Sequence, residues 1–278
     1  MDKRRSFARL WRCSLVLIVA LSEVLTPLRL KNVRAAPPYQ GAPANPRWGI
    51  QYINWWQLTA QCGGWSSGLE DRYAQAHDVG ATWNRWWAQW EVIENAPGLD
   101  AAQWNWQEHD EAVLRDMQHG FRTDLILKNT PSFYNLGGGV PRNLDQPPLL
   151  PDGSINRDNY WAYFVYSVVQ RYKPGGSVGT NVRFYEVWNE PDLSSEWEGT
   201  PEDYALLLKV AYIAIKAADP DATVLFGAPQ YWLQRDGWLR SVLFSIKSDT
   251  EAQAHNYYFD VLPLHWYDRA QDSFDWTN

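Results

Sequence analysis

Two carboxylic acids, Glu186 and Glu190, lie four residues apart in an aromatic stretch that spans residues 184–192. Glu190 directly follows an indole and an amide, Trp188 and Asn189. Burial among such groups disfavours the charged form of a carboxyl group, which suits it to donate a proton. Cleavage of a glycosidic bond needs an acid that protonates the departing oxygen and a second carboxylate that attacks the anomeric carbon. Glu190 is therefore our candidate for the general acid/base of a double-displacement reaction.

Glu186 is the obvious rival to Glu190, because it precedes it on the same predicted strand. Four residues of extended chain place Glu186 about 13 Å deeper, at roughly 3.3 Å per residue. A carboxylate at that depth needs a partner, such as an arginine on a neighbouring strand. We therefore interpret Glu186 as half of a structural ion pair, and Asp192 as a turn or cap residue.

The run Val187–Pro191 resembles the strand-four signature of glycoside hydrolase clan A, the retaining (β/α)8-barrel glycosidases that include families 5, 10, 39 and 42. The resemblance covers about residues 47–268 and is strongest at this run. It implies that Glu190 is the acid/base and that Asn189 binds the sugar 2-hydroxyl. It also implies a nucleophilic glutamate at the end of strand seven, and the sequence stops before that strand. We therefore expect a chain truncated before strand seven, with only one of the two catalytic carboxylates.

Two further stretches carry the same resemblance, and a third departs from it. Arg85 corresponds to an arginine that holds the nucleophile carboxylate, with a counter-ion to a buried glutamate as the alternative. His265 and Tyr267 resemble the His-x-Tyr of family 5, whose Tyr contacts the nucleophile and whose His lines the sugar site. Taken alone, His265 would be interpreted as a core histidine. Asn129 ends the third strand, where we predict substrate binding. Family 5 more often shows a histidine at this strand end, which leaves family 39 or an unassigned relative open.

The aromatic content is high, with 18 Trp and 15 Tyr in 278 residues. Indole and phenol rings stack on the flat faces of sugar rings, so this composition suits a carbohydrate substrate, and the remaining rings belong to the core. Three tryptophans near predicted strand ends are candidate stacking platforms: Trp188, Trp232 and Trp266.

A regular alternation of elements would position these residues. The predicted strands are Trp48–Ile53, Thr82–Trp90, Thr123–Asn129, Arg183–Asn189, Thr223–Ala228 and Phe259–His265. The predicted helices are Leu69–Val79, Gln107–His119, Arg157–Tyr172, Pro201–Ala218 and Asp236–Lys247. This order predicts an α/β fold with a parallel sheet and helical crossovers, in which His109 lies on the helix surface.

Two architectures fit such an order, the closed TIM (β/α)8 barrel and the open doubly wound sheet. The open sheet usually carries a glycine-rich nucleotide turn after its first strand, and Ile53–Trp56 contains no glycine. We therefore predict an incomplete TIM barrel of about six strand–helix units over residues 37–278, with no cofactor. Active sites of such barrels lie at the C-terminal ends of the strands.

The first 36 residues have the pattern of a signal peptide. Basic residues precede a short apolar run, Leu15–Leu25, and small residues follow at Ala35 and Ala36, where we expect cleavage and hence secretion. An uncleaved anchor is the alternative. The segment is basic and the whole chain carries a charge of −7, so the remainder is strongly acidic, which argues against nucleic acid or anionic membranes as partners. Cys62 is then the lone cysteine, which excludes an internal disulfide and a metal site built from four cysteines, and no metal is predicted.

Two other hypotheses remain open from the sequence. The chain could be a non-catalytic carbohydrate-binding fragment or pseudoenzyme that keeps the aromatic cleft without the chemistry. It could also be a fragment that does not fold, because a six-stranded barrel exposes two strand edges. No pattern indicates an oligomeric state.

Overall fold

The computed structural model describes residues 47–53, 68–230 and 236–265 of the chain. Strands and helices alternate through these ranges, as the sequence predicts. The elements are, in order, β1 (Gly49–Gln51), α2 (Gly68–Asp78), β2 (Trp83–Gln89), α3 (Trp90–Ile93), η1 (Ala101–Gln103), α4 (Gln107–Gln118), β3 (Arg122–Lys128), α5 (Tyr160–Tyr172), β4 (Phe184–Val187), α6 (Pro201–Ala218), β5 (Thr223–Phe226), α7 (Asp236–Ser248) and η3 (Ala252–Tyr258).

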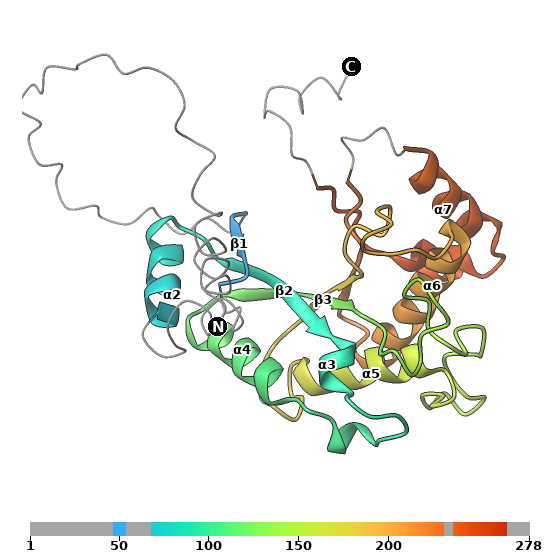
Figure 1. Ribbon diagram of the computed structural model, residues 1–278. Coiled ribbons are helices and arrows are strands. Elements are labelled where there is room, and N and C mark those ends of the chain that lie inside the picture. The colour runs from blue at the N-terminus through green and yellow to red at the C-terminus, as the bar shows by residue number, and fades with distance from the viewer. Residues whose placement is uncertain (1–46, 54–67, 231–235, 266–278) are drawn as a thin grey trace, which may run out of the picture.

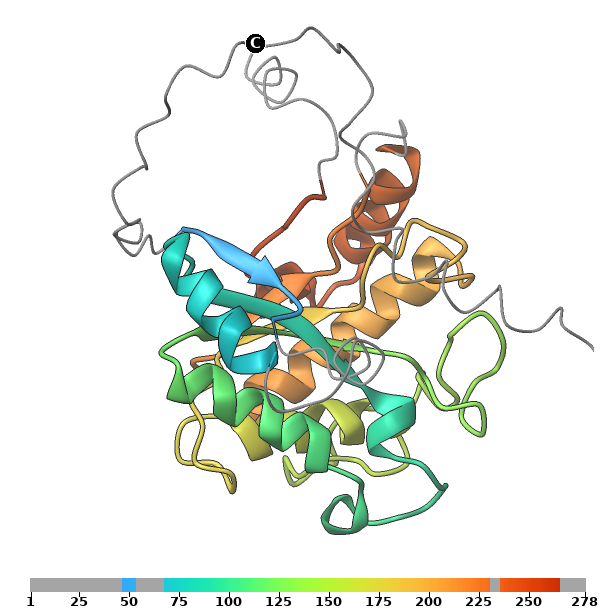
Figure 2. The same cartoon turned by 60° about the vertical axis from the view of Figure 1, so that its left-hand side comes forward.

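The five strands form one parallel sheet in the order β1-β2-β3-β4-β5. The helices follow one another round one side of this sheet, from α2 past α4 and α5 to α6 and α7 (Figure 1). β1 lies along the edge of β2, where the sheet begins (Figure 2). A parallel sheet in sequential order with helices on its outer side is the arrangement of a (β/α)8 barrel, which closes with eight strands. The predicted α/β class with a parallel sheet is therefore confirmed.

The sixth predicted strand is wrong as a regular strand. The segment Phe259–His265 joins the sheet through two isolated parallel bridges, Leu225↔Val261 and Gln230↔His265. Pro263 lies between these bridges and has no amide hydrogen to donate to a ladder. The segment nevertheless brings His265 to the C-terminal end of the sheet.

The two faces of the sheet differ in character, as β2 shows. Asn84 and Trp86 are buried against the helices, whereas Arg85 and Trp87 face the inner side and are half-buried. Aromatic rings fill the helix side, and Trp90 stacks on Phe164 of α5 with ring centroids 5.1 Å apart. The inner side bounds a cavity of about 510 Å³ with residues from all five strands in its lining.

The longest helix, α6, has the local signals that its sequence predicts. Thr200 caps it by accepting a hydrogen bond from the Asp203 amide at 3.1 Å, and the Asp203 side chain bonds back to the Thr200 amide. Pro201 occupies the first turn, where its missing donor is not needed. The helix packs against α5 and α7. It buries side chains that recur at helical spacing: Tyr204, Leu207, Leu208, Ala211 and Ile215. Within the described ranges, no helix is long and apolar enough to cross a membrane.

His109 of α4 is buried, which corrects the prediction that it lies on the surface. His109 is only 2% exposed, and its Nε2 accepts a hydrogen bond from the Gln89 amide at 3.3 Å. Burial lowers the pKa of His109 to about 4. His109 shares a helix face with Ala112 and Val113, three and four residues on, and both are buried. Helical spacing, rather than residue type, was the signal for its burial.

Candidate active site

Glu190 stands at a kink that follows Val187, the last residue of β4. The backbone is left-handed at Trp188 (φ 70°) and at Glu190 (φ 45°), which costs an L-residue about 1–2 kcal/mol. Tyr204 of α6 supports the kink, because its hydroxyl donates to the Val187 carbonyl at 2.9 Å and accepts from the Gly227 amide at 2.7 Å. Strained backbone held by its surroundings is typical of functional sites. The helical spacing of Tyr204 predicts a buried position and gives no signal for this contact.

His265 lies against Glu190, with its Nδ1 2.6 Å from Glu190 Oε1. Glu190 is 8% exposed and His265 is half-buried, so the pair sits at the boundary between the interior and solvent. Asp192 helps to hold the two segments together, because its Oδ1 accepts from the Gln230 amide at 3.0 Å, and Gln230 bridges to His265. The structure therefore brings together a predicted acid and a predicted sugar-site histidine that are 75 residues apart in the chain. Such a pair can hold and transfer a proton.

Arg85 forms a bidentate ion pair with Glu186 on the inner face of the sheet. Its Nε and Nη2 donate to the two carboxylate oxygens, each at 2.8 Å. Glu186 is 1% exposed and also accepts from the Ala228 amide at 3.0 Å, so the predicted structural ion pair is confirmed. Arg85 Nη2 donates to Asn189 Oδ1 as well, at 3.0 Å. This bond turns the amide oxygen inward, so the NH2 group is the part of Asn189 that can donate to a ligand.

Two buried polar atoms of the inner face have no hydrogen-bond partner in the described part of the chain, Arg85 Nη1 and Asp124 Oδ1. Both residues line the 510 Å³ cavity. Burial raises the pKa of Asp124 well above its ordinary value, and the charge of Glu186 raises it further, while Arg85 opposes both. The ionised form of Asp124 is therefore disfavoured, and Arg85 Nη1 is left without an acceptor in the described part of the chain.

A second group of side chains at the C-terminal end of the strands was missed by sequence reasoning. Lys128, at the end of β3, lies 2.5 Å from Glu196 Oε2 and 4.4 Å from the centre of the Trp87 ring. Tyr52 meets the same ring edge-on at 4.9 Å. Burial raises the pKa of Tyr52 to about 12. The one available signal was a lysine as the last residue of a buried strand, because a buried lysine needs an acidic partner.

Asn129 and Trp188, both predicted to bind substrate, are engaged with other parts of the protein. Asn129 donates through Nδ2 to Glu91 Oε1 at 2.8 Å, so its amide is engaged with α3. Trp188 is 2% exposed, its Nε1 donates to the Glu196 carbonyl at 2.9 Å, and Trp197 packs on it at 5.0 Å. A ring so enclosed offers no face to a sugar, so the predicted platform at Trp188 is corrected to a core residue. Three further predicted residues lie outside the described residues: Trp232, Trp266 and Tyr267.

Metal ligands are not clustered in the part of the chain that the structure describes. No group of three or more His, Cys, Asp or Glu side chains there could hold a metal ion.

Comparison with known proteins gives a result for structure and none for sequence. No family model matches the chain, and no curated protein matches it. Among solved structures, the catalytic domain of GH30 xylanase C from Talaromyces cellulolyticus aligns with a TM-score of 0.54 and 17% identity, over 82% of this chain and 54% of that chain. A monomeric beta-xylosidase from Caulobacter crescentus CB15 aligns with a TM-score of 0.53 and 21% identity, over 79% of this chain and 41% of that one.

A fungal beta-1,4-galactanase aligns similarly, with a TM-score of 0.51 and 15% identity, over 79% of this chain and 63% of that chain. The chain thus spans between 41% and 63% of the length of these three structures. At such identities the likeness concerns the fold, and the resemblance drawn from the strand-four run is confirmed at that level. The described residues have the fold of part of a (β/α)8 barrel.

Proposed function

We propose that this chain carries the acid/base half of a retaining glycoside hydrolase site, with Glu190 as the acid/base. The contact between Glu190 and His265 at the strained end of β4 carries the proposal. Asn189 is fixed beside it by Arg85. The fold of the structural neighbours supports the proposal, because active sites of such barrels lie at this end of the strands.

In the first step of the proposed reaction, neutral Glu190 gives its proton to the departing glycosidic oxygen while a second carboxylate bonds to the anomeric carbon. In the second step, ionised Glu190 takes a proton from water, whose oxygen replaces the carboxylate at that carbon. His265 shares a hydrogen bond with Glu190 in both steps. The NH2 group of Asn189 donates to the sugar 2-hydroxyl, the role that the clan A resemblance implies.

The second carboxylate is proposed to be a glutamate of a seventh strand, beyond the 278 residues of this chain. Arg85 supports this, because it lines the inner-face cavity and its Nη1 has no hydrogen-bond partner among the described residues. The other inner-face carboxylates are unsuited to the role. Arg85 and the Ala228 amide occupy Glu186, and burial raises the pKa of Asp124, which disfavours the ionised form that a nucleophile needs.

A second candidate function is carbohydrate binding without catalysis by the chain on its own. Double displacement needs a second, ionised carboxylate. The inner-face carboxylates of the described residues favour this candidate, because Arg85 engages Glu186 and burial disfavours the ionised form of Asp124. For both candidates the proposed ligand is a neutral or plant-type polysaccharide. Secretion through residues 1–36 remains part of the proposal.

The proposal can be tested at the site itself by NMR of the histidine side chains. The chain has five histidines, and His265→Gln identifies the imidazole signal of His265. The probes are β-1,4-linked hexasaccharides of xylose, glucose and galactose. We expect at least one of them to shift the His265 signal, and Asn189→Ala to raise the sugar concentration needed by at least about tenfold, or about 1.4 kcal/mol.

Asn129→Ala is the matched control, because it removes an amide from the same end of the sheet that is engaged with Glu91. It should leave the titration unchanged. A His265 signal that does not move with any of the three sugars would refute the carbohydrate site at Glu190.

A further inference from the structure

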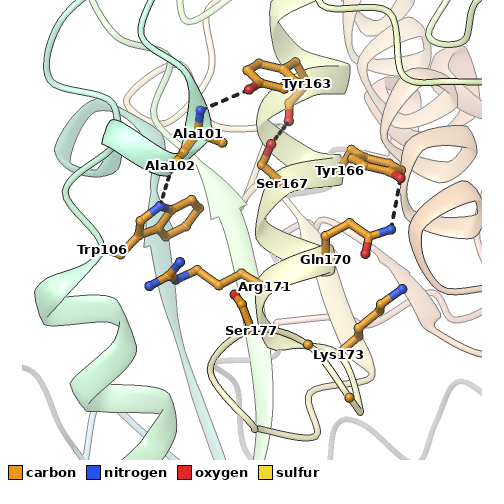
Figure 3. Close-up of a pocket in the computed structure, with 12 residues that line it drawn as sticks. Ala101, Ala102, Trp106, Tyr163, Tyr166, Ser167, Gln170, Arg171, Lys173 and Ser177 are labelled. Carbon is orange, nitrogen blue, oxygen red and sulfur yellow. Dashed lines mark hydrogen bonds between the residues drawn. The ribbon is translucent and has the colours of Figure 1, made fainter.

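A groove on the outer surface of the molecule is separate from the Glu190 site. It lies between α5 and the segment that contains η1 and the start of α4 (Figure 3). Its volume is about 560 Å³, within the range of small-ligand sites. The residues of its lining are Ala101, Ala102, Trp106, Tyr163, Tyr166, Ser167, Gln170, Arg171, Lys173, Gly175, Gly176 and Ser177.

One face of α5 supplies the aromatic wall of the groove. Tyr163, Tyr166 and Gln170 recur at helical spacing on the side of α5 opposite its buried residues, and all three are half-buried. The Tyr163 hydroxyl accepts from the Ala101 amide at 3.0 Å, and the Tyr166 hydroxyl accepts from Gln170 Nε2 at 3.0 Å (Figure 3). Because these bonds hold both rings by their polar ends, the rings are already ordered before a ligand arrives.

Both cationic side chains of the groove, Arg171 and Lys173, already have partners within the protein. Arg171 forms a bidentate pair with Asp110, at 2.7 and 2.5 Å, and its guanidinium lies 4.7 Å from the centre of the Trp106 ring. Lys173 Nζ donates to the Ala218 carbonyl at 2.7 Å. An anionic ligand such as a phosphate would compete with these partners, so the groove favours a neutral ligand.

The lining also argues against an apolar partner. It contains no Leu, Ile, Val, Met or Phe, the side chains that anchor an amphipathic helix or an acyl chain in a groove. What remains is a combination of tyrosine rings with hydroxyl and amide groups beside them. A sugar chain matches this combination, because it presents flat C–H faces for the rings and hydroxyl groups for the polar atoms.

We propose that the groove is a second carbohydrate site, which holds a neutral oligosaccharide on the outer surface of α5 away from the Glu190 site. The sugar class rests on the proposed function, since the same polysaccharide would occupy both sites. Tyr166 stacks on a sugar ring, and Gln170 and Ser177 bond its hydroxyl groups.

The site can be tested by calorimetric titration of the same three β-1,4-linked hexasaccharides. The groove variant is Tyr166→Ala with Gln170→Ala, and the Glu190-site variant is Asn189→Ala. We expect the Asn189→Ala protein to retain one binding event, and the groove variant to lose that event or bind at least about tenfold more weakly. Tyr257→Ala is the matched control, because it removes an exposed tyrosine of η3 outside the groove, and it should change nothing.

A groove variant that binds every sugar as tightly as the unmodified chain, with the same melting temperature, overturns the second site. So does an unmodified chain that binds none of them by calorimetry. The His265 NMR signal reports on the Glu190 site alone, so a failure of the groove and a failure of the proposed function are read separately.

Discussion

Two buried carboxylate clusters, on opposite faces of the same sheet, differ in how completely they are satisfied. On the helix side, Asp116 is 0% exposed and accepts from Tyr73 at 2.6 Å, Asn84 at 2.9 Å and Thr123 at 2.8 Å. On the inner side, the Arg85–Glu186 pair is well formed, yet Arg85 Nη1 and Asp124 Oδ1 are buried without a partner in the described ranges.

The completeness of hydrogen bonding distinguishes a structural cluster from a candidate functional one. Buried polar groups are almost always hydrogen-bonded, so a fully bonded cluster such as that of Asp116 needs no ligand to explain it. Arg85 Nη1 differs from these atoms, because it has no partner in the described ranges and belongs to a residue that lines a cavity. Arg85 of the inner cluster also donates to Asn189, the residue before Glu190. The bonds of the Asp116 cluster instead join α4 to strands of the sheet, as the bond from Asn84 of β2 does.

The largest expected effect comes from breaking the inner ion pair. Arg85→Met leaves Glu186 as a buried charge without its main partner, and we expect the free energy of unfolding in urea to fall by about 3–5 kcal/mol. Arg85→Met combined with Glu186→Leu removes both charges and should recover most of that loss. A single variant within about 1 kcal/mol of the unmodified chain would show that Glu186 is not held as we describe.

The pH dependence of stability tests the helix-side cluster around Asp116. Burial raises the pKa of Asp116 from 3.8 to about 6. Between pH 4 and 6 the folded protein keeps a proton that the unfolded chain releases, so this contribution to the free energy of unfolding falls as the pH rises, by about 3 kcal/mol. His109, whose pKa burial lowers from 6.5 to about 4, contributes a rise of about the same size over pH 4 to 6.5.

The two contributions oppose each other, and single variants separate them. The difference in free energy of unfolding between Asp116→Asn and the unmodified chain should shift by about 3 kcal/mol in favour of the variant as the pH rises from 4 to 7. The reason is that the variant lacks the decline that Asp116 causes. His109→Gln should lose about as much over the same interval. Urea unfolding at four or five pH values measures both. Parallel pH profiles for the three proteins would contradict the assigned pKa shifts.

The smallest effect is expected at Asp124. Burial raises the pKa of Asp124 and so disfavours its ionised form, and Asp124→Asn replaces the carboxyl with a neutral group of the same shape. The free energy of unfolding at pH 7 should change by less than about 0.5 kcal/mol. A loss of more than about 2 kcal/mol in urea unfolding would mean that Asp124 is ionised and forms part of the Arg85 pair.

Much of the fold follows from local sequence signals. The capping box and Pro201 set the start of α6, and the alternation of strands and helices indicated a parallel sheet in sequential order. The prediction of a regular sixth strand was wrong, because the composition of a segment does not show whether it has pairing partners on both sides. Pro263 also lacks the amide hydrogen that a regular ladder needs. Buried His109 was misjudged by residue type, although its helical spacing pointed inward.

The candidate site was predictable only in part. The strand-four run placed Glu190 and Asn189 at the correct end of the sheet, but it also suggested that Trp188 was an open platform, and the backbone kink turns that ring into the core. The Lys128–Glu196 contact joins residues 68 positions apart, and no spacing rule reads a pair so distant. Tertiary contacts of this kind decide which polar residues are available to a ligand.

The proposed acid role of Glu190 is tested most directly by supplying azide as an external nucleophile. Azide attacks the anomeric carbon of an aryl β-glycoside, the bond to the aryl oxygen breaks, and Glu190 protonates that oxygen. A panel of 2,4-dinitrophenyl and phenyl β-glycosides of xylose, glucose and galactose compares leaving groups that do not need a proton with ones that do.

We expect the unmodified chain to form glycosyl azide from both leaving groups. Glu190→Gln should react only with the dinitrophenyl compound, because loss of the acid lowers the rate with the phenyl compound by about 10²–10⁴-fold. Glu91→Gln, an exposed carboxyl at the same end of the sheet, is the matched control and should behave as the unmodified chain. Equal rates with the phenyl glycoside for the unmodified chain and Glu190→Gln would contradict the assignment of Glu190 as the general acid.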